Sequence, residues 1–180
     1  MNCWALIPVK AGEDGKSRLA GALDSGERAA LVRSMLAHVV AAAEEARAIT
    51  RLLLVGPSRH GLSDSIALLA DKGEGLNPAL QDALAAIAPN GPSRIIVVAA
   101  DLPAVTAREL DLMAMAPSDA VAIAPDRHGT GTNALSLPIP AAQEFRFAFG
   151  DDSFARHRAE AERLGLEVET VFSRGLEQDI

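Results

Sequence analysis

The segment at residues 10–18 carries residue types that suit the binding of a phosphate chain. Lys10, Lys16 and Arg18 stand near two glycines, directly after the apolar run at residues 3–9. Fixed cations offset phosphate charge, and glycine lets a phosphate approach backbone N–H groups closely. The spacing lacks the earlier glycine of a Walker P-loop. A solvated loop with ordinary surface charges is the alternative interpretation.

A second candidate is Asp101, which follows the apolar run at residues 94–100. A carboxylate at the end of a buried strand points into the crevice where α/β sheets bind ligands. Mg²⁺ prefers one or two carboxylates together with phosphate oxygens, so Asp101 is a candidate ligand for a nucleotide-bound metal. The alternative is an Asp that serves only a turn or a helix entry.

The third segment, residues 126–133, reads DRHGTGTN and is longer than a tight hairpin requires. Arg127 and His128 can hold an anion, and the alternating glycines and threonines offer backbone N–H groups and hydroxyls. His128 can instead be a general base, and a plain surface loop is a further alternative.

Two predicted helix starts add candidates. Asn77 precedes a predicted helix at residues 78–88, where it can serve as the N-cap or read a base edge. Gly150 and Ser153 lie at the start of another predicted helix, with Ser153 as a candidate N-cap. Backbone N–H groups at such a start can bind phosphate or carboxylate. The acids between them can instead serve the helix dipole.

The elements that must position these residues alternate between strand-like and helix-like patterns. Capping-box spacing begins two of the predicted helices, at Asp24 with Glu27 and at Thr106 with Glu109. Alternation of this kind predicts an α/β fold, a three-layer αβα sandwich around a mostly parallel, Rossmann-like sheet. The predicted strands are residues 3–9, 51–55, 94–100, 119–124, 134–137 and 167–172, and the predicted helices 24–43, 65–70, 78–88, 106–116 and 153–164.

Composition narrows the class of protein. The 180 residues suit one domain, and 49% apolar with 23% charged residues exclude wholesale disorder. A formal charge of −7 argues against nucleic acid or an anionic membrane as the main partner. Cys3 is the single cysteine, so neither an internal disulfide nor a thiolate zinc cage can form. We expect a cytoplasmic protein whose Cys3, Trp4, His38, His60 and His157 are structural residues.

With these segments in view, the chain resembles the 2-phospho-L-lactate guanylyltransferase family, whose bacterial members are also described as phosphoenolpyruvate guanylyltransferases. The family shares the nucleotidyltransferase fold of molybdopterin guanylyltransferases and sugar-nucleotide pyrophosphorylases. Five strings in order carry the resemblance, which runs almost end to end: residues 7–10 with 16–19, 75–77, 100–103, 125–133, and 149–150 with 153–155.

The resemblance implies transfer of GMP from GTP to the phosphate of a three-carbon phospho-acid in coenzyme F-420 biosynthesis. It implies that Lys10, Lys16 and Arg18 clamp GTP phosphates and that Asn77 lies near the guanine. Asp101 would hold Mg²⁺, and the phospho-acid would contact Thr132, Gly150 and Ser153, with Thr130 as the alternative to Thr132. Arg127 and His128 complete the predicted substrate site.

Relatives also place an Asp-x-Asp pair near the end of the chain, so Asp179 is a predicted second metal ligand. The residue that would complete the pair is missing after Ile180, so either the tail is clipped or this member binds the metal with fewer carboxylates. We expect one domain over residues 1–180 with a clipped tail, and the resemblance is compatible with a homodimer. Two other functions stay open: a related nucleotidyltransferase with a sugar phosphate or molybdopterin as acceptor, and a GTP-binding module without turnover.

Overall fold

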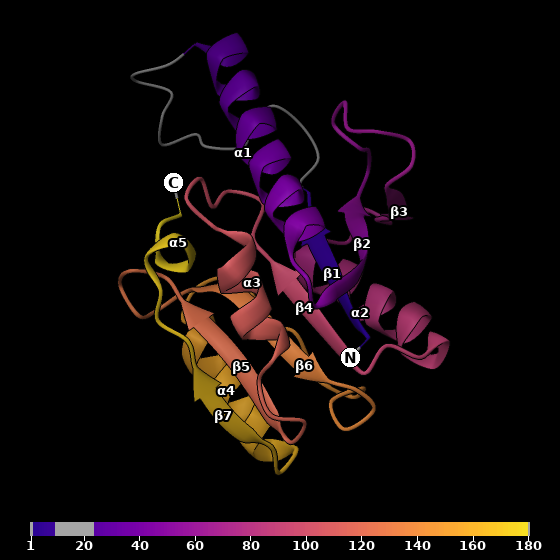
Figure 1. Ribbon diagram of the computed structural model, residues 1–180, viewed down its shortest axis with the longest axis vertical. Helices are drawn as coiled ribbons and strands as arrows, with labels where there is room; N and C mark the ends of the chain where they lie inside the picture. Colours follow the sequence, from indigo (N-terminus) through magenta and orange to yellow (C-terminus); the bar gives the residue numbers. More distant parts are fainter. Residues whose placement is uncertain (1, 10–23, 180) are drawn as a thin grey trace.

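The computed structural model describes residues 2–9 and 24–179 (Figure 1). These residues form seven strands and the helices between them. The strands are β1 (Cys3–Pro8), β2 (Ile49–Gly56), β3 (Ala67–Ala70), β4 (Arg94–Val98), β5 (Ala120–Pro125), β6 (Thr132–Pro138) and β7 (Glu167–Thr170). The helices are α1 (Ser25–Glu45), α2 (Leu76–Ile87) with the 3₁₀ turn η2 (Ala88–Asn90), α3 (Ala107–Ala114), α4 (Ser153–Arg163) and α5 (Arg174–Glu177).

The strands form one sheet in the order β3-β2-β1-β4-β6-β5-β7. Strand β6 is antiparallel to both of its neighbours, whereas the other described pairs are parallel. The carboxyl ends of the parallel strands and the amino end of β6 therefore meet at one edge of the sheet. Ligands of open α/β sheets bind at this carboxyl edge.

Helices cover both faces of the sheet, which makes the predicted three layers (Figure 1). Helices α1 and α3 pack over one face, where Leu36 and Leu110 belong to one buried cluster with strand residues such as Ile96. Helices α2 and α4 pack over the other face, where Leu84 and Ala161 join strand residues of the opposite pleat. Strands that are buried on both faces explain why most of the predicted strands read as continuous apolar runs.

Both predicted capping boxes are present. The Asp24 carboxylate accepts from the N–H of Glu27 at the start of α1, and Thr106 and Glu109 bond in the same way at the start of α3. Both helix starts can be predicted from the local sequence alone, because the two residues of a capping box hydrogen-bond to each other's backbone N–H groups.

Three local predictions were wrong. Residues 65–70 form no helix, because Ala67–Ala70 pairs with the end of β2 as a short parallel edge strand. A run of six residues is too short for periodicity to separate helix from strand. Asn77 does not cap α2, whose N-cap is Gly75, and Ser153 is the first residue of α4, whose N-cap is Asp152.

Strand β6 begins with an irregularity. Ala124 of β5 faces Ala134, but Pro125 faces Thr132, so the pairing skips Asn133. Such a bulge re-aims the side chains around it. In the described part of the chain, no helix is both long enough and apolar enough to span a membrane.

Candidate functional site

The described candidates lie along the carboxyl edge of the sheet. Asp101 follows the end of β4, and residues 126–131 connect β5 to β6, which begins at Thr132. The segment that follows β7 carries α5 and Asp179 to the same edge (Figure 1). Lys10, Lys16 and Arg18 lie outside the described residues, so their predicted contact with a phosphate chain stays a prediction.

Residues 126–131 fold around the side chain of Asp126. Its carboxylate accepts from the N–H of Thr130 at 2.9 Å, and its backbone N–H donates to the carbonyl of Gly131. Partial burial tends to raise the pKa of Asp126, but hydrogen bonds from the backbone of Thr130, Gly131 and His128 outweigh it and keep the pKa low. The Asp126 carboxylate thus holds the shape of the loop through hydrogen bonds from the loop's own backbone.

The exposed tip of this loop carries Arg127 and His128, and Arg127 Nε donates to His128 Nε2 at 3.2 Å. The two threonines of the loop differ in their surroundings. Thr130 is exposed and its hydroxyl lies 3.4 Å from the Asp126 carboxylate, whereas Thr132 is buried and bonded to His157. Which threonine contacts the substrate stays a prediction, and only Thr132 belongs to a buried network.

His157, predicted from the sequence to be a structural residue, lies at the centre of that network. Its Nδ1 is 3.0 Å from the Thr132 hydroxyl, and its Nε2 accepts from the N–H of Ala148 at 3.0 Å. The ring is fully buried between Phe145 and Phe149. Burial lowers the pKa of His157 to about 4, only partly opposed by Glu160. The imidazole is therefore neutral near pH 7.

Asn77 holds the next residue of the same loop. Its side-chain amide donates to the carbonyl of Phe149 at 3.0 Å, and its oxygen accepts from the N–H of Phe149 at 2.8 Å. The predicted contact between Asn77 and guanine is not tested by this geometry. The structure gives the amide a positioning role for the segment that precedes Gly150.

At the start of α4, two backbone N–H groups that could bind an anion are already bonded to carbonyls of the protein. The N–H of Ser153 donates to the carbonyl of Gly150 at 3.2 Å, and the N–H of Phe154 donates to the carbonyl of Thr130 at 3.0 Å. Gly150 has a φ of 121°, a conformation that favours glycine. The two bonds tie α4 to both neighbouring loops, so Gly150, Ser153 and Thr132 lie in one connected region.

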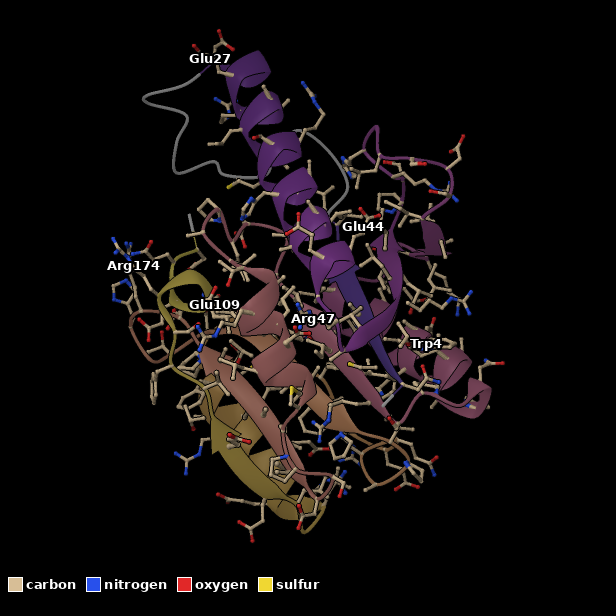
Figure 2. All side chains as sticks on the ribbon, in the orientation of Figure 1. Trp4, Glu27, Glu44, Arg47, Glu109 and Arg174 are labelled. Carbon is tan, nitrogen blue, oxygen red and sulfur yellow. The ribbon has the colours of Figure 1, made fainter. Side chains whose placement is uncertain are left out.

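Hydrogen bonds from two parts of the chain hold the tail, the segment of α5 and the residues after it up to Asp179. Glu109 accepts from the N–H of Gly175 at 2.8 Å, and Figure 2 shows Glu109 beside the segment that carries Arg174. The side chain of Asn133 donates to the carbonyl of Leu176 at 2.9 Å and lies 3.4 Å from the Asp179 carboxylate. Burial would raise the pKa of Glu109, but hydrogen bonds from Thr106 and Gly175 lower it below its usual value.

Asn133 also connects this tail to β4, because its carbonyl accepts from the N–H of Ala99, two residues before Asp101. Asn133 thus bonds to Asp179 and to Ala99, which lies two residues before the other predicted metal ligand, Asp101. Among residues 2–9 and 24–179, no group of three or more His, Cys, Asp or Glu side chains could hold a metal ion. Two carboxylates fit Mg²⁺ that brings phosphate oxygens of a nucleotide with it, rather than a metal held by protein alone.

Other features of the described chain lie away from this edge or are inert. An open hollow of about 390 Å³ lies between the end of α1 and strands β2 and β3, and none of the predicted site residues lines it. Cys3 is buried, which raises the pKa of its thiol to about 12, so it is no nucleophile.

The sequence did not indicate His157 or Glu109 as parts of this region, and it placed Asn133 in the candidate segment at residues 126–133 without a role of its own. His157 lies four residues after Ser153, on the same face of a predicted helix, and that spacing is the signal that could have found it. Glu109 was predicted only as half of a capping box. Its second bond, to Gly175, joins residues far apart in the chain and leaves no local pattern.

The fold is that of nucleotidyltransferases. A putative nucleotide-diphospho-sugar transferase from Desulfovibrio desulfuricans G20 superimposes with a TM-score of 0.73 at 18% identity, over 94% of this chain and 79% of that one. A nucleotidyl transferase from Methanothermobacter gives a TM-score of 0.66 at 15% identity, over 99% of this chain and 91% of that one. At such identities the likeness concerns the fold alone.

Sequence relationships are more specific. Residues 3–179 match the family described as guanylyl transferase CofC like. A phosphoenolpyruvate guanylyltransferase from Sphaerobacter thermophilus is 40% identical over 185 residues, covering 100% of this chain and 88% of that protein. A 3-phospho-D-glycerate guanylyltransferase from Phenylobacterium zucineum is 33% identical over 187 residues, covering 98% of this chain and 84% of that protein. The chain belongs to the CofC-like guanylyl transferase family and is a nucleotidyltransferase.

Proposed function

We propose that the protein transfers GMP from GTP to the phosphate of a three-carbon phospho-acid and releases pyrophosphate. The observation that carries the proposal is the match over nearly the whole chain to guanylyltransferases named for phosphoenolpyruvate and for 3-phospho-D-glycerate. The grouping of the described candidate residues at one edge of the sheet supports it. On the family resemblance, the product serves coenzyme F-420 biosynthesis in the cytoplasm.

The proposed chemistry needs placement and charge neutralisation more than proton transfer. A phosphate monoester has its second pKa near 6, so the acceptor is largely dianionic at pH 7 and needs no general base. An oxygen of that phosphate forms a bond to the α-phosphorus of GTP. The bond from the same phosphorus to the α,β-bridging oxygen breaks, and pyrophosphate leaves with the electron pair. His128 is therefore proposed as an anion contact beside Arg127 rather than as a base.

The chain's residues divide this work. Lys10, Lys16 and Arg18 are proposed to bind the GTP phosphates, with Asn77 near the guanine, and Thr132, Gly150 and Ser153 to bind the phospho-acid. Asp101 and Asp179 are proposed to hold Mg²⁺, which when bound supplies charge neutralisation on the phosphates. Each role is an inference from the family motifs, supported by the common edge where the described members lie.

The test is release of pyrophosphate. The protein is incubated with GTP and Mg²⁺ and with phosphoenolpyruvate, 2-phospho-L-lactate or 3-phosphoglycerate in separate reactions, and mannose 1-phosphate serves as an unrelated phosphate acceptor. We expect pyrophosphate with at least one of the three acids and none with the sugar phosphate. Silence with all three acids contradicts the proposal, and binding of GTP in that case points to a module without turnover.

A further inference from the structure

The hydrogen bonds of His157 define which of its ring nitrogens carries the proton. A backbone N–H can only donate, so Nε2, which lies 3.0 Å from the N–H of Ala148, is the acceptor. A neutral imidazole has one N–H, which must then be on Nδ1. That N–H points to the Thr132 hydroxyl at 3.0 Å. Thr132 Oγ therefore accepts from His157, and the hydrogen of the hydroxyl is left for another acceptor.

The same ring also fixes the loop across from Thr132. Ala148, held by Nε2, precedes Phe149, whose backbone N–H and carbonyl are both held by Asn77. Gly150 comes next in the chain. One imidazole thus sets the distance between the start of β6 and the segment that leads to Gly150 and Ser153.

The packing around His157 restricts the rotation of its ring. His157 is fully buried, with its centroid 4.7 Å from the ring of Phe149 and 5.8 Å from that of Phe145. An edge-on contact with Phe149 and a tilted one with Phe145 restrict rotation of the imidazole. Its two polar atoms are both satisfied, as buried polar atoms must be, and both partners lie on elements that reach the carboxyl edge.

We infer that His157 is a positioning residue for the acceptor site, which orients the Thr132 hydroxyl as a donor to an anionic oxygen of the phospho-acid and holds residues 148–150 around it. The inference rests on the proposed function for the identity of that anion. His157 itself does not touch the substrate, because Thr132 and Ala148 take both of its nitrogens. Burial of the ring keeps the neutral form, and with it this donor direction, throughout the neutral pH range.

Three substitutions separate the two bonds. His157→Phe keeps a ring and removes both polar atoms, whereas His157→Asn offers an amide near Nδ1 and His157→Gln one near Nε2. Ala161→Gly is the matched control, because Ala161 is buried one turn further on the same helix and its side chain forms no hydrogen bond. It loosens α4 without changing the hydrogen bonds.

The experiment measures the KM of GTP, the KM of the phospho-acid and kcat by pyrophosphate release, together with the Kd of the acid by calorimetry and the unfolding midpoint. We expect His157→Phe to raise the KM and Kd of the acid about 10-fold, the size of one lost hydrogen bond to a charged group, and to change the KM of GTP less than two-fold. Asn or Gln should recover part of the loss, and Ala161→Gly should change neither constant.

The outcomes distinguish this inference from the proposed function. If the unaltered protein turns over and His157→Phe leaves the KM of the acid unchanged, or raises the KM of the acid and the KM of GTP equally, the inference is wrong. If the unaltered protein binds the acid without releasing pyrophosphate, the proposed function is wrong while a weaker Kd in His157→Phe still supports the positioning role. If it binds none of the three acids, both are wrong.

Discussion

At the scale of single residues, the surroundings of the ionisable groups favour the neutral form of one and the charged form of others. His157 is buried and neutral, whereas Glu109, Asp126 and Glu160 accept enough hydrogen bonds to remain ionised. For a histidine whose pKa is lowered on folding, the unfolded chain takes up the proton first. Its contribution to stability is fully present above the unfolded pKa of about 6.5 and is lost as the pH falls toward 4.

A pH titration of stability tests this constraint. We expect the free energy of unfolding to fall by up to about 3 kcal/mol between pH 6.5 and 4 through His157 alone. The difference between the unaltered protein and His157→Phe should therefore be constant above pH 7 and shrink below pH 6.5. Urea unfolding at half-unit steps down to pH 5 stays above the range where the carboxylates begin to contribute. A difference that does not change over these steps would show that His157 is not neutral and buried.

Asp101 is the proposed metal ligand that follows β4. We expect Asp101→Asn to reduce pyrophosphate release by at least about 100-fold, because a neutral amide replaces one of two carboxylates proposed for the metal. The unfolding midpoint should change little. Asp119→Asn is the control, since Asp119 precedes β5 at the opposite edge of the sheet. Full turnover by Asp101→Asn would remove Asp101 from the proposed metal site.

At the scale of elements, the position of α5 depends on a close approach between Gly175 and the backbone of Ala104. A Cβ at Gly175 would lie 2.5 Å from the carbonyl oxygen of Ala104, which is backbone and cannot rotate away. Glycine at this position lets α5 pack against the start of α3, where Glu109 holds its N–H. The tail in turn brings Asp179 to Asn133.

Gly175→Ala should therefore displace the tail while the sheet stays folded. We expect a stability loss of about 1–3 kcal/mol, typical of overpacking, and a larger relative loss of pyrophosphate release because Asp179 moves with α5. Glu109→Gln, which keeps the shape and removes the charge, should give an intermediate effect in both measurements. Unfolding curves and initial rates on the two variants decide this, and normal turnover by Gly175→Ala would contradict it.

The elements also show how far the sequence could be read. The starts of α1 and α3 were predictable because capping boxes are local, and the buried strands because their apolar runs are continuous. Strand β3 was not, since only pairing with β2 makes Ala67–Ala70 extended. Asp101 and residues 126–133 were predictable as strand-end polar segments. The roles of His157 and Asn133 depend on contacts 25 and 43 residues away in the chain, which no local pattern encodes.

At the scale of the whole molecule, the two edges of the sheet have different tasks. The carboxyl edge holds the described candidate residues, and the opposite edge holds Arg94, a nearly buried guanidinium at the start of β4. Arg94 donates to the hydroxyl of Ser136 at 3.0 Å and to the carbonyls of Pro117 and Ala120. These bonds join β4, β6 and the loop before β5.

Arg94→Leu should separate stability from activity. We expect the free energy of unfolding to fall by about 3 kcal/mol, because the buried carbonyls lose their donor. The KM of GTP and the KM of the phospho-acid should both stay within two-fold, since the change lies at the opposite edge. Urea unfolding and steady-state rates on the same preparation provide the comparison. A shift in either KM without loss of stability would contradict this division.

The bulge at the start of β6 has a consequence for how this protein tolerates changes in length. Further along the strand, Ala134 packs with the α1 and α3 core and Leu135 with the α2 and α4 core. Strict alternation would send Thr132 toward α3 and Asn133 toward α4. The skipped pair reverses this, so that Thr132 meets His157 and Asn133 meets Leu176. Deleting a single residue here would exchange the two side chains between the faces of the sheet. Between β5 and β6 the protein should therefore tolerate substitutions better than insertions or deletions.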